Sequence, residues 1–252
     1  MISMNWAQRL TSDVADFLYP PACLNCGGDI AAGKTRSFCQ DCFQKISVPL
    51  QNRCERCSAP VGPHVNTASG CLHCKSVNPQ YRQTISIGVY EETLKQVCRR
   101  CKTRHRRPLT AACSRLLLEQ HHATLRDWDV HLVLPVPHHW TDRLRFVDQP
   151  AETIAEEFAR FLMVPADRHI LFKVRRTRKQ HELTASARRN NLRGAFQVNS
   201  SARLKGLRIL ITDDVMTTGT TANRLTRLLL DAGAEAVYVA VLARVLLLKS
   251  SS

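Results

Sequence analysis

ILITDDVMTTGTT, at residues 209–221, is the stretch that decides the fold predicted for this chain. An apolar strand leads to two adjacent, solvent-facing acids, Asp213 and Asp214, and then to a glycine among threonines where a helix begins. In open α/β sheets, ligands bind beyond the carboxyl ends of the strands. Backbone N–H groups at the start of a helix attract phosphate, and Gly219 lets the backbone come close to it. We therefore predict a phosphate-binding turn.

The two acids give this turn a second feature. Carboxylates would repel a phosphate, but they suit the hydroxyl groups of a ribose, either directly or through Mg²⁺. A simple capped helix after an acidic strand end is the alternative, but such a cap needs only one Thr or Asp. The string thus favours a ribose-phosphate site.

Around this stretch, apolar runs typical of buried strands alternate with patterns typical of amphipathic helices. Strands are predicted at 84–90, 130–136, 170–174, 195–198, 207–211 and 236–243. Helices are predicted at 91–101, 109–125, 151–163 and 220–231. The alternation indicates an α/β domain whose mostly parallel sheet is flanked by helices.

Eight of the eleven cysteines lie in four Cys-x-x-Cys pairs. The pairs are Cys23/Cys26, Cys39/Cys42, Cys54/Cys57 and Cys71/Cys74. The sequence around these pairs is loop-rich and poor in large apolar residues, so this segment needs a metal to order it. Zinc takes four thiolates at tetrahedral corners, which predicts two structural Zn²⁺ sites, with an iron–sulfur cluster as the alternative. We favour sequential pairing, first pair with second and third with fourth, over interleaved pairing.

Cys98 and Cys101 form a fifth pair, with His105, Cys113 and His121 nearby in the sequence. A third metal site is one interpretation of this group. The other, which we favour, places Cys98 and Cys101 on one face of a helix as small apolar side chains.

The net charge of +15 is concentrated in two segments. Residues 95–107 hold seven Lys/Arg and no acid, and residues 173–193 hold eight Lys/Arg against Glu182. Dense clusters of this kind predict a polyanionic partner, such as a diphosphate or a nucleic-acid backbone. Residues 173–193 contain no aromatic side chain for base stacking. We expect any binding of single-stranded DNA there to be weak, salt-dependent and indifferent to sequence.

The chain shows neither an export signal nor a membrane-spanning stretch. Arg9, Asp13 and Asp16 interrupt the apolar residues near the N-terminus, and the apolar run at 236–243 is far shorter than a bilayer requires. We expect a cytoplasmic protein without membrane insertion.

The acidic pair and the threonine turn resemble the phosphoribosyl-diphosphate (PRPP) motif of type I phosphoribosyltransferases. The resemblance implies that Asp213 and Asp214 face the ribose hydroxyls. It implies that the 5′-phosphate is held by Thr217, Thr218, Gly219, Thr220 and Thr221.

Further segments resemble the ComF family, which includes competence proteins used in natural DNA uptake. They are LPVP at 134–137 with the following Arg143, Arg145 and Gln149, the T-x-x-Q…R-x-N-L-x-G-A-F pattern between Thr177 and Phe196, and the four cysteine pairs. The likeness covers residues 23–244 and implies a bacterial protein with a type I phosphoribosyltransferase fold behind a double zinc ribbon. It implies PRPP with Mg²⁺ as ligand, and single-stranded DNA and DNA-uptake proteins as partners.

The resemblance also implies further PRPP-binding residues, namely Lys102, Arg143, Arg145 and Arg189. Two segments depart from the family pattern: RFVDQ at 145–149 replaces Arg-Gly-Phe-Asn-Gln, and CKTRH at 101–105 lacks the usual aromatic residue and glycine. The altered 145–149 loop counts against efficient catalysis. Three functions stay open: a phosphoribosyltransferase with an unidentified acceptor, a non-catalytic factor that handles single-stranded DNA, and a PRPP-sensing regulator.

We therefore divide the chain into three regions. An amphipathic helix lies within residues 1–20, the double zinc ribbon occupies 21–78, and the phosphoribosyltransferase-type domain occupies 79–252.

Overall fold

The computed structural model describes residues 21–30, 37–47, 52–67, 70–138, 149–175 and 194–246. The helix expected within residues 1–20 lies outside this part of the chain. The described helices and strands are, in chain order, α2 (Gln40–Ile46), α3 (Leu72–Val77), β1 (Thr84–Val89), α4 (Glu92–Cys101), α5 (Arg107–Trp128), β2 (Leu132–Pro135), α7 (Pro150–Leu162), β3 (Leu171–Lys173), β4 (Phe196–Val198), β5 (Arg208–Met216), α9 (Thr220–Asp231) and β6 (Ala236–Arg244).

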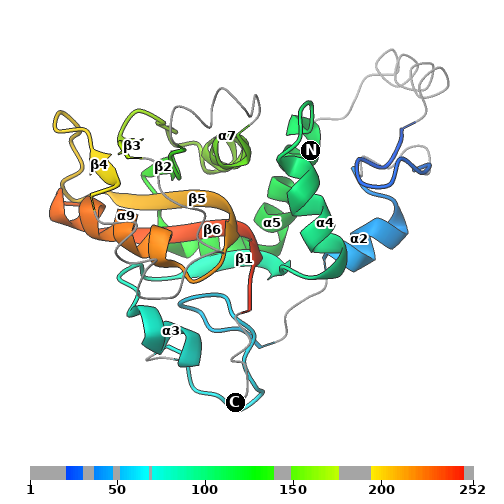
Figure 1. The fold of residues 1–252 in the computed structure, drawn as a ribbon, viewed down its shortest axis with the longest axis horizontal. Helices are drawn as coiled ribbons and strands as arrows, with labels where there is room; N and C mark the ends of the chain where they lie inside the picture. Colours follow the sequence, from blue (N-terminus) through cyan, green and yellow to red (C-terminus); the bar gives the residue numbers. More distant parts are fainter. Residues whose placement is uncertain are drawn as a thin grey trace.

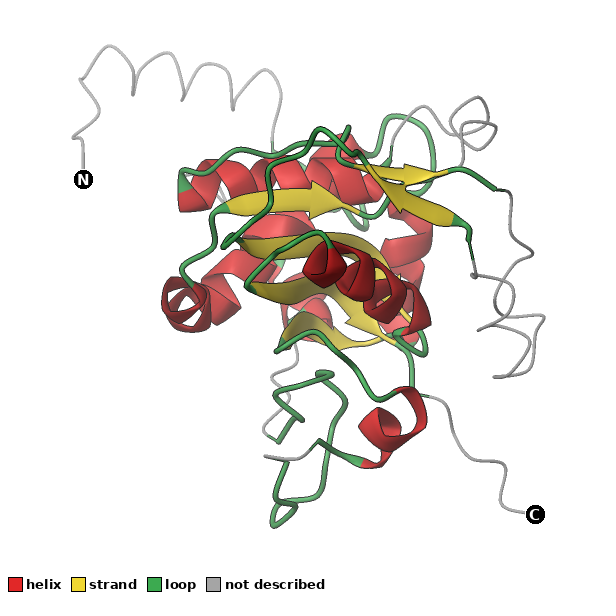
Figure 2. Cartoon of the chain, turned by 90° about the vertical axis from the view of Figure 1, so that its left-hand side faces the viewer, coloured by secondary structure: helices red, strands yellow, loops and turns green. Residues whose placement is uncertain are grey.

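The central sheet is parallel and has the strand order β1–β6–β5–β2 (Figure 1). Its register places Leu134, Ile211, Val239 and Thr84 in one row across the four strands. Every residue of β6 is buried, as expected for a central strand covered on both faces. Helices cover both faces of the sheet, as Figure 2 shows, so the predicted α/β architecture is confirmed.

Two apolar clusters pack on opposite faces of the sheet. On one face, Leu117, Phe158 and Leu242 belong to a cluster formed with α4, α5 and α7. On the other face, Ile211 and Leu229 belong to a cluster formed with α9 and the β3–β4 hairpin. Among the described elements, α4, α5 and α7 therefore lie on one side of the sheet and α9 on the other, and α9 begins just after the carboxyl end of β5.

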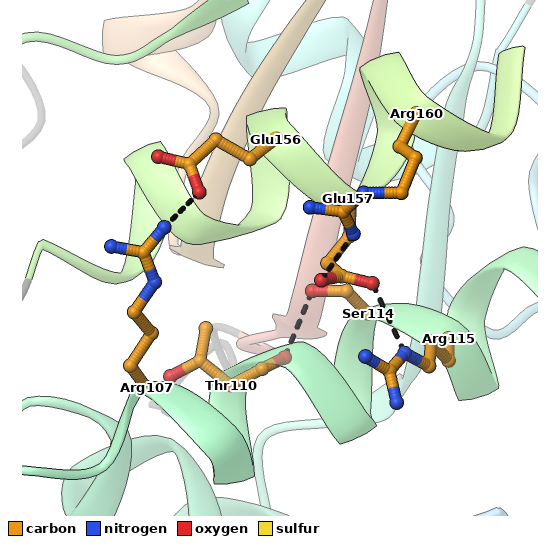
Figure 3. A network of polar contacts seen from close by, with 7 residues as sticks. All are labelled: Arg107, Thr110, Ser114, Arg115, Glu156, Glu157 and Arg160. Atoms are coloured by element: carbon orange, nitrogen blue, oxygen red, sulfur yellow. Dashed lines mark hydrogen bonds and ion pairs between the residues drawn. The ribbon is translucent and has the colours of Figure 1, made fainter. Parts of the chain in front are cut away.

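An ion-pair network joins α5 to α7 on the outside of the first face (Figure 3). Arg107 pairs with Glu156, and Glu157 accepts from Arg115 at 3.0 Å and from Arg160 at 2.7 Å. The arginine side chains are largely exposed, so solvent screens these pairs and they are expected to contribute little to stability. The network matters for function because it occupies Arg107 of the first basic segment.

Strands β3 and β4 form a separate antiparallel hairpin. They flank the second basic segment, most of which lies outside the described residues. Lys173 extends over the ring of Phe196, with its Nζ 5.9 Å from the ring centroid. The hairpin thus anchors both ends of the basic segment next to the main sheet.

The two cysteine-rich regions contact different parts of the α/β domain (Figure 1). Ile30, Phe38 and Ile46 of the first region join the apolar cluster of α4 and α5. The second region, residues 52–78, lies beside β1 and the end of β6. Helices α2 and α3 were not predicted, because they are six or seven residues long and show no sustained periodicity.

Candidate ribose-phosphate site and metal centres

The phosphate-binding turn lies where β5 ends and α9 begins. Gly219 has φ 77°, a left-handed conformation that a glycine adopts without strain. Its carbonyl accepts the backbone N–H of Asn223 at 2.8 Å. The hydroxyls of Thr218 and Thr220 are 2.7 Å apart, and the N–H of Thr220 points to Thr218 Oγ1 at 3.3 Å. The predicted helix at 220–231 is confirmed, so the turn presents helix N-terminal N–H groups as phosphate binding requires.

Gly219 is also a point of close packing. A Cβ at this position would lie 2.8 Å from Tyr81 Oη and 3.3 Å from Met216 Sδ. Tyr81 is 2% exposed and reaches this position from the chain just after the second cysteine-rich region. A glycine is required here by both its backbone angle and its neighbours.

The acidic pair lies inside β5, because the strand continues to Met216 instead of ending at residue 211. Neighbouring residues in a strand point to opposite faces, so Asp213 and Asp214 diverge. Asp214 is only 7% exposed, and the expectation that both acids face solvent is wrong for this residue. Asp213 is half-buried.

A lysine from a distant helix meets the acidic pair. Lys102, at the carboxyl end of α4, places its Nζ 2.7 Å from Asp214 Oδ2. Burial would lower the pKa of Lys102, but the negative charge of Asp214 and the hydrogen bond to it raise the pKa above its ordinary value. The resemblance placed Lys102 among the ligand-binding residues, and the structure brings it into contact with Asp214.

The environment of the Asp213 carboxyl disfavours its charged form. Burial raises the pKa of Asp213 well above its ordinary value, and the neighbouring charge of Asp214 adds to this effect. The N–H of Asp214 donates to Asp213 Oδ1 at 2.9 Å, which lowers the pKa only in part. Lys102 contacts Asp214 and acts on Asp213 only through its charge, which leaves the two acids suited to receiving a further cation or hydroxyl donors.

Not every predicted ligand can be placed. Thr217, Thr218, Thr220 and Thr221 are half-buried around the turn with Gly219. All three predicted arginines, Arg143, Arg145 and Arg189, lie outside the described residues, as do residues 145–148 of the altered loop.

The eight paired cysteines form two clusters with sequential pairing. Cys23, Cys26, Cys39 and Cys42 form the first, and Cys54, Cys57, Cys71 and Cys74 form the second, with the four Sγ atoms of each within 4.8 Å of one another. Tetrahedral zinc with Zn–S bonds of about 2.3 Å requires Sγ–Sγ separations near 3.8 Å. Cys26 and Cys39 are 3.7 Å apart, and Cys57 and Cys71 are 3.5 Å apart. Both clusters fit zinc.

The other cysteine pair is confirmed as part of a helix face. Cys98 and Cys101 lie in α4 and are 0% exposed, and Cys113 of α5 is equally buried. These three cysteines belong to the apolar cluster that α4, α5 and α7 form on one face of the sheet.

Comparison with known proteins identifies a zinc-ribbon part and a phosphoribosyltransferase part of the chain. Residues 14–78 match the family model of a double zinc ribbon domain, and residues 147–247 match that of a phosphoribosyl transferase domain. Competence protein F of Haemophilus influenzae is 29% identical over 228 residues, covering 88% of this chain and 96% of that protein. The DNA utilization protein YhgH of Salmonella typhi is 30% identical over 216 residues, covering 83% of this chain and 91% of that protein.

The chain belongs to the ComF family. Its α/β part has the type I phosphoribosyltransferase fold, and its N-terminal part is a double zinc ribbon. Among solved structures, the phosphoribosylpyrophosphate synthetase of Mycobacterium smegmatis is similar, with 23% identity over 52% of this chain and 33% of that protein and a TM-score of 0.33. Among the described residues, no helix is long and apolar enough to cross a membrane.

Two buried polar residues beside the turn were also missed by the sequence analysis. Arg244 is 3% exposed at the end of β6, and Asn223 is 7% exposed on the inner side of α9. Both contact the turn and the second zinc ribbon. A charged residue that ends an apolar run, and an amide on the buried face of a helix, are signals that could have revealed them.

Proposed function

We propose that this ComF-family protein binds PRPP together with Mg²⁺ at the carboxyl end of β5. The observation that supports it is one continuous piece of chain, in which an acidic pair leads directly to a turn of N–H and hydroxyl donors. In this arrangement Asp213 and Asp214 face the ribose hydroxyls, and residues 217–221 hold the 5′-phosphate. Lys102, Arg143, Arg145 and Arg189 face the diphosphate.

The chain's own residues account for most of the binding chemistry. The turn offers backbone N–H groups and threonine hydroxyls to a phosphate. Lys102 is half exposed, so its ammonium group can leave Asp214 for a diphosphate when ribose hydroxyls reach the acids. Mg²⁺, when bound, would neutralise charge on the diphosphate. Transfer of the phosphoribosyl group would release pyrophosphate, and the basic side chains would stabilise its developing charge.

The finer assignment of the protein follows from the family. We propose a cytoplasmic phosphoribosyltransferase-domain protein linked to DNA uptake, with an acceptor that is not identified by any feature of the site. We place the boundary between the double zinc ribbon and the phosphoribosyltransferase-type domain between residues 78 and 79. A PRPP-sensing regulator would use the same binding residues without transfer.

Handling of single-stranded DNA is the second candidate function, favoured by the exposed cations at the end of α4. Arg99 and Arg104 are exposed there. Other cations of the same segment have partners within the molecule: Arg100 donates to Asn25 Oδ1 at 3.1 Å, Lys102 pairs with Asp214, and Arg107 pairs with Glu156. The surface available to a nucleic-acid backbone is therefore smaller than the count of charges suggested.

Isothermal titration with PRPP and Mg²⁺ tests the first proposal. The parent should bind, and the double variant Asp213→Asn, Asp214→Asn should lose binding while keeping its fold. Asp231→Asn, at the far end of α9, is the matched control and should bind as the parent does. Unchanged PRPP binding by the double variant would show that the ribose is placed wrongly.

A parallel titration with single-stranded DNA distinguishes the second candidate. We expect weak binding whose log K falls with log[salt] at about −0.7 per phosphate neutralised. Arg104→Ala should flatten this slope, whereas Arg107→Ala should change it less because Arg107 already pairs with Glu156. DNA binding that ignores salt would exclude a backbone-driven interaction.

A further inference from the structure

A buried arginine connects the second zinc ribbon to the strand that carries the acidic pair. The Arg244 Nε donates to the backbone carbonyl of Cys57 at 3.0 Å, and its Nη1 donates to the carbonyl of Met216 at 3.0 Å. Cys57 is a ligand of the second cysteine cluster, and Met216 is the last residue of β5, directly before the phosphate-binding turn. One side chain thus hydrogen-bonds both to a residue of the metal centre and to the residue directly before the turn.

The charge of this arginine also points to the metal centre. Within the described part of the chain, its polar contacts are with backbone carbonyls, and a buried cation without a counter-charge is costly. Four thiolates outweigh the double charge of zinc, so a zinc-loaded cluster carries net negative charge. The loaded second cluster therefore supplies the missing counter-charge beside Arg244.

A buried asparagine makes a second connection on the other side of the turn. The Asn223 side chain accepts from the N–H of Gln80 at 2.7 Å and donates to the carbonyls of Val77 at 3.1 Å and Asn78 at 3.3 Å. Val77 is the last residue of α3, the short helix that contains Cys74, Asn78 is its C-cap, and Gln80 follows two residues later. The backbone N–H of Asn223 in turn donates to Gly219 in the turn.

The first cysteine cluster lacks connections of this kind among the described residues. Its neighbours are the apolar side chains of α4 and α5. Asn25 donates to Cys42 Sγ at 3.3 Å and accepts from Arg100 of α4 at 3.1 Å, so its polar connection leads to α4 and not to the turn. This contrast allows the two metal centres to be tested against each other.

We propose that zinc in the second cluster holds the phosphate-binding turn in its binding conformation, with Arg244 and Asn223 as the positioning residues. The proposal rests on the proposed function for its ligand, PRPP. Zinc occupancy of the second cluster and PRPP affinity are then linked, and by thermodynamic reciprocity each raises the affinity for the other by the same factor. Zinc in the first cluster has no such linkage.

Hydrogen exchange of the ligand-free protein tests the proposal independently of PRPP. Cys57→Ser removes a ligand of the second cluster and keeps the backbone carbonyl that Arg244 contacts, and Cys26→Ser is the matched variant of the first cluster. Amides of residues 216–223 should exchange about tenfold faster or more in Cys57→Ser and change little in Cys26→Ser. Equal exchange in the two variants would overturn the proposal.

Variants that keep both zinc ions distinguish a local effect on the turn from general unfolding of the protein. Arg244→Met and Asn223→Ala should retain two zinc ions per chain, speed exchange at 216–223 and weaken PRPP binding. Arg208→Met, which removes an arginine from the opposite end of β5, should leave both readouts unchanged. Should Arg244→Met fail to fold, Asn223→Ala carries the test, and unaltered exchange in that variant would contradict the proposal.

The reciprocal measurement uses a chelator. In the parent, PRPP with Mg²⁺ should raise the zinc affinity of one of the two sites, and Asn223→Ala should abolish that gain. If the parent binds no PRPP, the proposed function fails, while the exchange experiment still decides whether the second zinc orders the turn. PRPP binding with no effect on either zinc would refute the linkage alone.

Discussion

The two zinc ribbons use the same Cys-x-x-Cys pattern, but they join the α/β domain by different interactions. The first ribbon packs apolar side chains such as Phe38 and Ile46 against α4 and α5. The second ribbon is joined by hydrogen bonds, including Ser58 Oγ to Ser86 Oγ at 2.7 Å and Thr84 Oγ1 to the carbonyl of Arg56 at 2.9 Å. Apolar packing tolerates small shifts, whereas hydrogen bonds fix position and direction. The difference indicates an anchoring role for the first ribbon and a positioning role for the second.

The turns that hold the metal ligands differ in the same sense. Gly27, after Cys26, has φ 78° and open space around it, and Cys26 itself is exposed. The corresponding turn of the second ribbon has Ser58 at φ 57° with 0% exposure. A non-glycine residue in this conformation is held by its surroundings. The second ribbon is therefore the more closely integrated of the two.

The largest expected effect follows from metal removal. We expect two zinc ions per chain, counted by metal analysis of protein purified without added zinc. A chelator should remove the zinc of the first cluster faster, because Cys26 is exposed and Cys39 is half-buried, while all four ligands of the second cluster are buried. Structural zinc contributes about 10 kcal/mol or more in small zinc-binding peptides, so each loss should unfold its ribbon. A single rate for both ions, or an iron–sulfur absorption band, would break the comparison.

The next effect concerns the glycine against which Tyr81 packs. Gly219→Ala should lower the free energy of unfolding by about 2–5 kcal/mol, from the left-handed backbone and the contact with Tyr81 Oη together. Gly206→Ala is the matched control, since Gly206 has φ 75° but nothing within 4 Å of an added Cβ, and it should cost about 1–2 kcal/mol. Denaturant unfolding measures both. Equal losses would mean that Tyr81 does not constrain the turn.

A paired substitution compares the two modes of attachment. Ile46→Ala removes a side chain that is 1% exposed and should cost about 2–4 kcal/mol. Ser58→Ala removes one partner of a buried hydrogen bond and should cost about 1–2 kcal/mol. Only the serine variant should change hydrogen exchange at 216–223. The opposite pattern would reverse the roles assigned to the two ribbons.

The smallest effect is a change in pH dependence. Because the pKa of Asp213 is raised in the folded protein, the native state binds more protons than the unfolded state once the pH exceeds 3.8, the ordinary pKa of an aspartate. Stability should therefore fall as pH rises from that value through the raised pKa. Asp213→Asn should remove this fall, so the variant gains stability over the parent at neutral pH and loses the gain in acid. Thermal unfolding across pH measures it, and parallel curves would contradict the raised pKa.

The parts of the site that are local in sequence were predictable. The apolar run, the acids, the glycine and the helix at 220–231 all lie within one short stretch, and two four-cysteine sites followed from the even spacing of the cysteine pairs. The spacing left interleaved pairing open, and the structure shows the sequential pairing that we favoured. The end of β5 was not predictable, because polar residues from 212 onwards interrupt the apolar run while the backbone continues to pair with β6.

Contacts between distant segments could not be predicted from residue patterns. Arg244 and Cys57 are 187 positions apart, and Asn223 and Gln80 are 143 positions apart. No local periodicity encodes such a contact, since it depends on how the ribbon lies on the sheet. Lys102 was named only through the family resemblance, and its partner Asp214 emerged from the fold.

The position of the second ribbon has a consequence for the outer edge of β1, the first strand in the order of the sheet. β1 pairs with β6 on one side only, and its other side faces the ribbon. There the N–H of Thr84 donates to the carbonyl of Glu55 at 3.1 Å, and the carbonyl of Ser86 accepts from Arg53 Nη1 at 2.8 Å. An uncovered edge strand is a template for pairing with another chain, which leads to aggregation. A chain that lost its second zinc would therefore expose the edge of β1 to pairing with a second copy. The metal that orders the ribbon thus also protects the protein against association between its sheets.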